Sequence, residues 1–397
     1  MSDILDEGRN THSSSVDVPR PGVATPGASH YAAGVGESTA MSVAVIIVGF
    51  HNAADIVGCL RALAQSHASP TFDVFIAENG GAEGAAALQA ALMAPGSPCR
   101  EEHDASKFMR LFPALDAHIF SLTRHAAIPE TRVHLVVMHE NLGYAGAINA
   151  CLRPLLLMPG WEAAWILNPD TEPTPAALCE LADYAARRNK GMVGSRITGS
   201  SGAAVFCCRG LRWNRLTAST SAIGLGDSPA DNNVNPDIIE PMLDAPSGAS
   251  MYVTRDLIDH IGLMDERYFL YFEDMEWGCR AKDVGALGYA HQSVVPHKGG
   301  TTIGSASVRA GQSRLSVYLE FRNRILFVRA RHGGWLAWAI TMQFVHLAAY
   351  CVSGSLGNVI AGGQGVLAGL RGEVGRPDRI LQAHRASWTV RSLSDAD

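Results

Sequence analysis

VAVIIVG (43–49) is a short, continuous apolar run that ends in a glycine. Its β-branched residues favour a strand, and the lack of alternating polar positions is typical of a strand buried on both faces of a parallel sheet. Three later runs share this character, at DVFIA (73–77), VHLVVM (133–138) and AAWIL (163–167). Stretches with helical patterns separate them, at about 53–68, 82–93 and 145–157. This alternation predicts an α/β fold with a mostly parallel central sheet flanked by helices.

Polar clusters directly follow three of these runs. ENGG (78–81) follows the second run, ENLGYAGAIN (140–149) follows the third, and NPDT (168–171) follows the fourth. Ligands of open α/β sheets bind at the carboxyl ends of the strands. We therefore expect these clusters to converge on one crevice.

The overall composition limits the classes to which the protein can belong. Of the 397 residues 47% are hydrophobic, which is enough for a large core in two or more structural units. The formal net charge of -6 argues against duplex nucleic acid as the main partner. The eight cysteines form no CxxC pair, so we expect no zinc cluster, and reduced thiols fit a cytosolic location. The N-terminus lacks a basic region followed by an apolar stretch, so no secretory signal is expected.

Composition and pattern divide the chain into four regions. Residues 1–40 are rich in Ser, Gly and Pro, which predicts a disordered arm. A catalytic domain is expected over 41–310, with an irregular insertion at 95–130. A helical extension follows at 311–375, and 376–397 form a polar tail.

The helical extension contains a long segment without charged side chains. No Asp, Glu, Lys or Arg occurs from His332 to Leu370, and the segment carries Trp335, Trp338 and Tyr350. It is either a buried helical hairpin or a hairpin that lies in a membrane interface. In the second case, nearby arginines would face an anionic leaflet. These are Arg322, Arg324, Arg329 and Arg331.

Asp170 in LNPDT (167–171) is a candidate metal ligand. An aspartate just after a buried strand can hold Mg²⁺ or Mn²⁺ while the phosphates of a substrate supply other oxygens. The alternative is a helix cap, because Pro173 and Pro175 follow and a proline-led helix is ordinary capping chemistry.

The acidic cluster in FEDMEW (272–277) is a candidate for general-base chemistry. Glu273, Asp274 and Glu276 follow a run of aromatic residues, and a carboxylate with aromatic walls has a raised pKa that suits a base. The alternative is a helix start, where acids are common in the first turn.

Two smaller clusters complete the set of candidates. His297 in VVPHKGG (294–300) follows a predicted strand, and the glycines after it permit close approach to a phosphate or metal. Ser247, Gly248 and Ala249 precede another predicted strand and would let backbone approach a sugar. The alternatives are a structural histidine and a plain tight turn.

Taken in chain order, these clusters resemble family 2 glycosyltransferases of the GT-A fold, especially the bacterial rhamnosyltransferase and galactofuranosyltransferase branch. The resemblance covers roughly 43–330. It rests on six segments that match the family's motifs: VIIVGFHN (45–52), AENGG (77–81), ENLGYAGAIN (140–149), LNPDT (167–171), MDERYFLYFEDMEWGCRAKDVG (264–285) and PHKGG (296–300).

The resemblance implies a nucleotide-sugar-binding fold and a role for each matching residue. Asp170 and His297 would bind Mg²⁺ or Mn²⁺, and Asp274 would be the catalytic base of a single, inverting displacement. Glu78 would read a pyrimidine base, although the family usually has the shorter Asp there. The other donor-binding positions would be Phe50, Asn52, Asn79, Asn141, Gly143, Asn149 and Asn168. Acceptor-binding positions would be Ser247, Gly248, Ala249, Glu273, Glu276, Trp277 and Arg280.

A later helix also matches this branch. QSRLSVYLEFRNR (312–324) is similar to its Y-x-x-R-N helix, so Arg322 and Asn323 are expected to face the donor phosphates.

The expected function is transfer of a sugar, L-rhamnose from dTDP-rhamnose first, to an acceptor hydroxyl in cell-surface polysaccharide or glycolipid synthesis. Galactofuranosyl or other UDP-sugar transfer is the alternative, and a catalytically inactive assembly partner is the alternative of another class. A dinucleotide oxidoreductase would need GxGxxG after the first strand, which VGFHNAADIVG (48–58) lacks.

We expect a cytoplasmic enzyme, peripheral at the inner face of the membrane. The other expected partner of the charge-free segment is a second copy of this chain, in a homo-oligomer whose interface covers the segment.

Overall fold

The computed structural model describes residues 41–101, 116–124, 130–201, 204–228, 231, 233–298 and 312–381. The expected arm, 1–40, lies outside the described residues, and so does most of the expected tail, 376–397. Two parts of the expected insertion, 102–115 and 125–129, also lie outside them.

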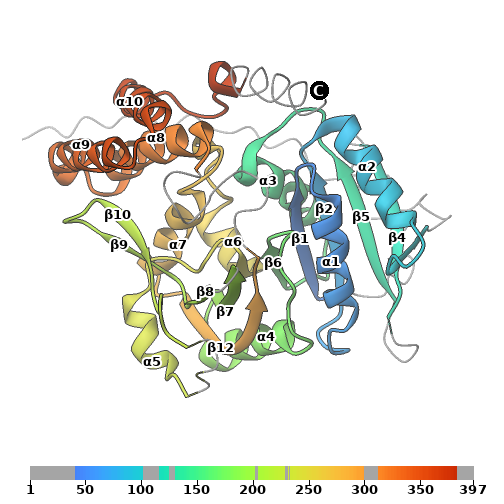
Figure 1. The fold of residues 1–397 in the computed structure, drawn as a ribbon. Helices are drawn as coiled ribbons and strands as arrows, with labels where there is room; N and C mark the ends of the chain where they lie inside the picture. The colour runs from blue at the N-terminus through green and yellow to red at the C-terminus, as the bar shows by residue number, and fades with distance from the viewer. Residues whose placement is uncertain are drawn as a thin grey trace, which may run out of the picture. The chain divides into compact units, whose positions relative to one another are not determined.

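A central sheet of ten described strands, most of them parallel, forms the core (Figure 1). Its order is β12-β7-β11-β6-β1-β2-β5-β4-β3, with β8 beside β7. The four predicted strands are present as β1, β2, β5 and β6, which run parallel in the middle of the sheet. The strands are β1 (Val43–Gly49), β2 (Phe72–Glu78), β3 (Cys99–Glu101), β4 (Asp116–Leu122), β5 (Thr131–Val137), β6 (Ala163–Leu167), β7 (Met192–Ser201), β8 (Ala204–Cys208), β11 (Ser250–Thr254) and β12 (Leu287–Pro296).

Helices cover both faces of this sheet. Val45 and Ile47 pack with α1 (Ala53–Ala64), α2 (Gly81–Met93) and α4 (Ala177–Arg188) on one face. Ala44 and Ile46 pack with α3 (Gly143–Leu156), α6 (Arg255–Ile261) and α7 (Glu273–Asp283) on the other. Because β1 is apolar at every position, it contributes to both layers, as the unbroken run VAVIIVG predicts.

The expected irregular insertion at 95–130 is partly wrong. β3 and β4 lie within it and extend the sheet beyond β5 as antiparallel strands. Ile119, Phe120 and Leu122 of β4 are buried, but polar residues lie between and around them. Such a strand near a sheet edge lacks the long apolar run that identifies a central strand.

A second, two-stranded sheet lies outside the central sheet, next to the C-terminal helices (Figure 1). It consists of β9 (Leu211–Asn214) and β10 (Ser219–Ala222). Trp213 of β9 packs edge-on against Phe272 and Phe327, with ring centroids 6.1 and 5.1 Å away. Three short helices, α5 (Pro236–Ile239), η1 (Glu240–Met242) and η2 (Glu266–Tyr268), occur in the same half of the chain.

The predicted C-terminal helical extension is confirmed as α8 (Arg314–Arg331), η4 (Gly333–Trp335), α9 (Leu336–Val352) and α10 (Leu356–Arg371). α10 lies very close to α8: a Cβ added at Gly365 would be 2.3 Å from the Tyr318 carbonyl oxygen, and one at Gly369 would be 2.8 Å from that of Arg322. Small residues on α10 therefore let the two backbones touch.

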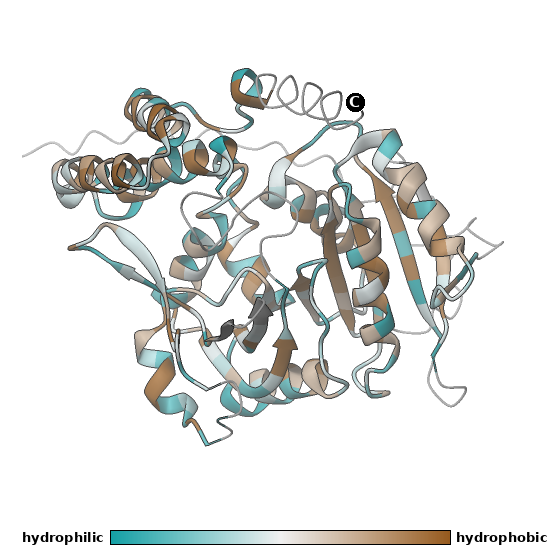
Figure 2. Cartoon of the chain, viewed as in Figure 1, coloured by the Kyte–Doolittle hydropathy of each residue, from teal (hydrophilic) through white to brown (hydrophobic). Residues whose placement is uncertain are grey.

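α9 is largely exposed, so the expectation of a buried hairpin does not hold for this helix. Figure 2 shows hydrophobic residues along much of α9. Only Ala339, Gln343 and Tyr350 of α9 are buried. Gly333–Val352 is long and apolar enough to span a membrane, and only 17% of its most apolar window is buried. The exposed stripe of α9 is Ala337, Trp338, Thr341, Phe344, Val345, Ala348, Cys351 and Val352.

The expectation that four arginines face a leaflet is wrong for two of them. Arg322 and Arg324 are buried in the interior of the helical extension, and buried guanidinium groups must find partners within the protein. Arg329, which donates to the Leu370 carbonyl, is exposed, and Arg331, which pairs with Asp283, is partly exposed. For these two residues the expected contact with a leaflet stays a prediction.

Candidate active site

Asp170 and His297 meet at the carboxyl edge of the sheet. Asp170 follows β6 and His297 follows β12, and the Asp170 Oδ1 atom lies 3.0 Å from His297 Nε2. Backbone contacts fix this meeting: Lys298 N–H donates to the Asp170 carbonyl at 3.0 Å, and Thr171 pairs with His297. Asp170 does not cap the next helix, because α4 begins at Ala177 and has Ala176 at its N-cap.

These two side chains fit a divalent cation. Ligands about 2.1 Å from an octahedral ion, placed at right angles, are about 3.0 Å apart, which is the separation found here. Among the residues that the structure describes, no third His, Cys, Asp or Glu completes the group. An ion held here would take its remaining oxygens from a diphosphate and water, as Mg²⁺ commonly does.

Glu78 lies under the loop that follows β1. Its side chain is 1% exposed, and its carboxylate accepts hydrogen bonds from Gly80 N–H at 2.8 Å and His51 N–H at 3.4 Å. A Cβ added at Gly49, Gly80 or Gly84 would lie within 2.4 to 2.6 Å of its oxygens. The three glycines thus leave room for the longer acid, whose pKa burial raises. That Glu78 reads a pyrimidine base stays a prediction.

The other donor-loop residues brace neighbouring backbone. Asn52 accepts from Phe50 N–H at 3.0 Å. Asn79, which is buried, donates to the Gly143 carbonyl at 2.8 Å and accepts from Leu142 N–H at 3.1 Å. Asn141 Oδ1 accepts from Gly143 N–H at 2.9 Å. The loops after β1, β2 and β5 are therefore joined into one edge.

Asn149 lies apart from this edge. It is fully buried, its amide nitrogen donates to the Met264 carbonyl and to Glu266, and its oxygen accepts from Met264 N–H. All its polar atoms are used in joining α3 to the segment before α7. Asn149 therefore supports the site from within rather than lining it.

Glu273 and Asp274 begin α7 as two adjacent carboxyl groups, of which Glu273 is buried and Asp274 is partly exposed. Asp274 Oδ1 accepts from Met275 N–H at 2.7 Å, and a Cβ added at Gly248 would lie 2.8 Å from Asp274 Oδ2. Burial raises the pKa of Asp274, partly opposed by backbone N–H groups of Met275 and Gly248. Burial and the charge of Asp274 raise the pKa of Glu273 well above its usual range. Glu273 Oε2 has no hydrogen-bond partner within the described part of the chain.

The 247–249 segment is a turn that closely approaches Asp274. Ser250 N–H donates to the Ser247 carbonyl at 3.0 Å, and Asn168 N–H donates to that of Ala249 at 3.1 Å. The turn therefore joins the end of β6 to the first turn of α7, and only glycine fits at 248.

Tyr144 connects the two halves of the site, although the sequence pattern assigned it no role beyond being a matching residue of the ENLGYAGAIN segment. Its hydroxyl oxygen lies 3.0 Å from Asn168 Oδ1 and 2.9 Å from the Gly248 carbonyl oxygen. It thus links the turn that carries Asp170 with the turn that touches Asp274. The signal was present, because Tyr144 is the aromatic residue of the ENLGYAGAIN segment.

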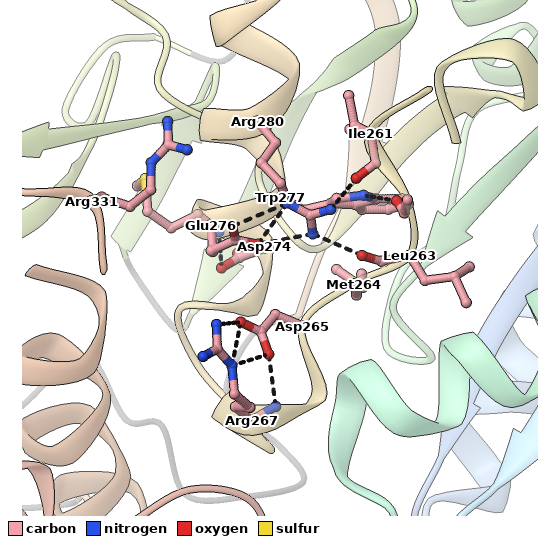
Figure 3. Close-up of polar contacts among 12 residues, drawn as sticks. Ile261, Leu263, Met264, Asp265, Arg267, Asp274, Glu276, Trp277, Arg280 and Arg331 are labelled. Atoms are coloured by element: carbon pink, nitrogen blue, oxygen red, sulfur yellow. Dashed lines mark hydrogen bonds and ion pairs between the residues drawn. The ribbon is translucent and has the colours of Figure 1, made fainter. Parts of the chain in front are cut away.

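Glu276 and Arg280 form a pair inside α7 (Figure 3). Arg280 Nε donates to both oxygens of Glu276 at 3.0 Å, and its Nη2 donates to the Leu263 carbonyl at 2.8 Å. Trp277 is fully buried and donates to the Gly262 carbonyl at 2.9 Å. The expectation that Trp277 contacts an acceptor is therefore wrong, because its side chain is in the core at the junction of α6 and α7.

The chain is similar in sequence to known glycosyltransferases, although no family model matches it. It is 28% identical over 229 residues to the N-acetylglucosaminyl-diphospho-decaprenol L-rhamnosyltransferase of Mycobacterium tuberculosis, an alignment covering 52% of this chain and 72% of that protein. It is 25% identical over 198 residues to the low-salt glycan biosynthesis hexosyltransferase Agl10 of Haloferax volcanii, covering 49% and 59%. These relatives confirm the resemblance that the motifs indicate.

Two solved structures are similar to the chain. Staphylococcus aureus TarS 1–349 with UDP-GlcNAc has a TM-score of 0.45 at 14% identity, covering 86% of this chain and 83% of that one. Mannosyltransferase PcManGT from Pyrobaculum calidifontis, with GDP-Man and Mn²⁺, has a TM-score of 0.44 at 15% identity, covering 90% and 89%.

Proposed function

We propose that this protein is a metal-dependent, inverting glycosyltransferase that uses a nucleotide-diphosphate sugar. One observation carries the proposal. The Asp170–His297 pair and the Asp274 carboxyl lie at the same edge of the sheet, and the Tyr144 hydroxyl contacts both the turn that carries Asp170 and the turn that touches Asp274. A donor diphosphate and an acceptor hydroxyl can therefore be bound on adjoining sides of one site.

The reaction follows from these positions. The Asp274 carboxylate takes the proton from the acceptor hydroxyl while that oxygen forms a bond to the anomeric carbon of the donor. The bond between the anomeric carbon and the diphosphate oxygen breaks, and the electron pair leaves with the diphosphate. One displacement of this kind inverts the configuration. A divalent cation bound by Asp170 and His297 would neutralise the charge of the leaving diphosphate.

We propose dTDP-L-rhamnose as the first donor and a lipid-linked glycan as the acceptor. The Mycobacterium tuberculosis relative, an L-rhamnosyltransferase named for N-acetylglucosaminyl-diphospho-decaprenol, supports both choices. UDP-galactofuranose and other UDP-sugars are the second choice, because the resemblance includes galactofuranosyltransferases. The enzyme would act in cell-surface polysaccharide or glycolipid synthesis.

The exposed stripe of α9 supports a peripheral place on the cytoplasmic membrane, where a lipid-linked acceptor would present its hydroxyl. Phe344, Val345 and Val352 are 61%, 56% and 90% exposed. Tryptophan is enriched at membrane interfaces, and Trp335 and Trp338 are 39% and 45% exposed at the start of the same helix. Burying apolar surface stabilises by about 25 cal/mol per Å², so a shallow insertion would hold the protein.

A transfer assay tests the proposed function. Purified protein would receive dTDP-L-rhamnose and a short-chain GlcNAc-diphospholipid, with Mn²⁺ or with EDTA. We expect transfer only with the metal, and NMR of the product should show the anomeric configuration opposite to that of the donor. Absence of transfer from every pyrimidine-diphosphate sugar would leave the inactive assembly partner as the better description. Retained configuration would exclude the single displacement.

A further inference from the structure

The backbone just before Asp274 is strained. Phe269, Tyr271 and Phe272 have φ values of 66°, 69° and 75°, a region that side chains other than glycine rarely adopt. Three such residues within four positions lead directly into the first turn of α7. Strained backbone persists only where its surroundings hold it in place, and it is concentrated at functional sites.

The strain begins in a γ-turn centred on Phe269. Its φ and ψ are 66° and −57°, and Leu270 N–H donates to the Tyr268 carbonyl at 2.8 Å. A γ-turn with positive φ is the rare, strained form. It turns the chain sharply and leaves the carbonyl groups of Tyr268, Leu270 and Tyr271 pointing away from α7, toward α8.

Asn323 of α8 satisfies all three of these carbonyls. Its Nδ2 atom lies 2.8 Å from the Tyr268 oxygen, 2.8 Å from the Leu270 oxygen and 2.9 Å from the Tyr271 oxygen. Asn323 is fully buried, so water cannot replace it. One side-chain amide, whose two N–H groups are shared among three carbonyls, therefore contacts most of the strained segment.

Arg322 fixes the orientation of that amide. Arg322 Nε donates to Asn323 Oδ1 at 2.9 Å, which turns the Nδ2 atom toward the carbonyls. Its other nitrogens donate to the Tyr268 and Gly375 carbonyls at 2.9 and 2.7 Å. The expectation that Arg322 and Asn323 face donor phosphates is therefore wrong, because their polar groups are used in these contacts.

Other contacts close around the same segment. Tyr144 N–H donates to the Phe269 carbonyl at 2.7 Å, and a Cβ added at Gly143 would lie 2.2 Å from that oxygen. The Tyr271 hydroxyl donates to Ser316 Oγ of α8 at 3.0 Å. The segment is thus held between α3 on the donor side and α8 on the other.

We infer that Asn323 is a positioning residue for the transfer reaction: it holds the 268–272 segment in its strained form and so aims Asp274 at the acceptor. This inference rests on the proposed function of Asp274. Without the Asn323 amide, the Leu270 and Tyr271 carbonyls each lose a hydrogen bond, while the Tyr268 carbonyl keeps those from Leu270 N–H and Arg322, and the positive φ angles of the segment relax. The first turn of α7 then rotates, while the donor loops after β1 and β2, which Asn323 does not touch, keep their shape.

Asn323→Ala and Asn323→Asp test this role. We expect kcat for transfer to fall about a hundredfold, as misplacement of a reacting group by about 1 Å can cause. The dissociation constant of dTDP with Mn²⁺, measured by calorimetry, should stay within about threefold of wild type. The Asp variant removes the donor at constant size and should be at least as slow as the Ala variant.

Gln343→Leu is the matched control. Gln343 is also fully buried and polar, accepts from Arg324 at 2.8 Å and donates to the Phe321 carbonyl at 2.9 Å, but it joins α8 to α9 and does not touch 268–272. We expect it to lower the melting temperature while kcat stays near wild type. Should Asn323→Ala not fold, Tyr271→Phe, which removes the hydroxyl that contacts Ser316, should lower kcat several-fold at unchanged nucleotide affinity.

Hydrogen exchange separates this inference from the proposed function. Amides of 266–276 should exchange faster in Asn323→Ala than in Gln343→Leu, whether or not transfer is detected. A wild-type protein without transfer would overturn the proposed function, and the exchange result would still decide whether Asn323 holds the segment. Unchanged exchange, unchanged kcat, or an equal loss of kcat and nucleotide affinity would each overturn the positioning role.

Discussion

Two adjacent carboxyl groups begin α7, and their surroundings raise the pKa of both. Burial raises the pKa of Glu273, and the negative charge of Asp274 adds to that effect. Burial also raises the pKa of Asp274, but the hydrogen bonds from the Met275 and Gly248 N–H groups favour its ionised form. These hydrogen bonds support Asp274 as the group that accepts the proton.

Asp274→Asn should lower kcat by about 100- to 10,000-fold, the usual contribution of a general base. Glu273→Gln should keep kcat within about threefold, because it keeps the shape of the side chain and leaves the proposed base, Asp274, in place. Steady-state kinetics at saturating donor compares the two, with circular dichroism as the control for folding. A larger loss in Glu273→Gln would assign the base to Glu273.

The pH dependence follows from the same shift. A base must be unprotonated to act, and the raised pKa of Asp274 keeps it protonated at pH values where an ordinary aspartate, with a pKa of about 3.9, is ionised. The acidic limb of kcat/KM for the acceptor, measured at saturating donor and Mn²⁺, should therefore lie above that value. Glu273→Gln should leave the limb in place. A limb at the ordinary aspartate value would contradict the assignment.

The metal pair gives a further prediction at this scale. Asp170→Ala and His297→Ala should each weaken binding of dTDP about tenfold or more in the presence of Mn²⁺ and have little effect without it, because each removes one ligand of the cation. Glu172→Gln is the control, since this carboxylate lies two positions from Asp170 but pairs with Lys298. Calorimetric titration with and without Mn²⁺ measures the effect. Metal dependence that persists in both variants would exclude these ligands.

At the scale of elements, apolar runs predicted the four central strands because each is buried on both faces. β4 was missed because only part of it is apolar. The helix α8 was recognised, but its Arg322 and Asn323 were assigned to phosphates. A buried arginine or asparagine must find hydrogen-bond partners within the protein. Only the three-dimensional structure shows that the partners of the Asn323 amide are carbonyl groups 52 to 55 positions earlier in the chain.

The exposed stripe of α9 predicts a measurable attachment to membranes. Wild-type protein should float with anionic liposomes, and the double variant Phe344→Glu, Val345→Glu should stay with the soluble protein, because two charges would have to enter the apolar layer. Leu157→Glu is the control, since Leu157 is 87% exposed on another part of the protein. Truncation before α9 is a poorer test, because it also removes α10 and uncovers α8.

Sedimentation of the same variants distinguishes the alternative. Wild type that stays soluble but sediments as a dimer, with the double variant a monomer, would assign the stripe to an interface between two copies. Flotation of the double variant equal to that of wild type would remove α9 from membrane attachment.

At the scale of the whole molecule, the candidate site gathers residues that are far apart in sequence. Asn168 and His297 are 129 positions apart, and Tyr144 and Gly248 are 104 apart. The sequence predicted their meeting because the carboxyl ends of parallel strands share one edge. It did not predict the links between them, since the Tyr144 hydroxyl and the Gly248 turn meet only after β11 has inserted beside β6.

Donor choice is a property of this whole edge. We expect productive use of dTDP-L-rhamnose first and UDP-galactofuranose or another UDP-sugar second, with a GDP-sugar at least about a hundredfold poorer in kcat/KM. The resemblance to rhamnosyl- and galactofuranosyltransferases gives this order. A panel of nucleotide sugars measures it. Efficient use of a GDP-sugar would contradict the pyrimidine preference.

The contacts of Asn323 also affect the order in which the site is completed during protein synthesis. A ribosome adds about 5–20 residues per second, so Asn323 is made roughly 3–10 s after the carbonyls that it will hold. By then every side chain proposed for chemistry, from Asp170 to His297, is already in the chain. A nascent protein that has folded its sheet would carry the full set of reactive groups in an unfinished arrangement. In that case the protein would become active only once α8 has been synthesised and has packed against the 268–272 segment.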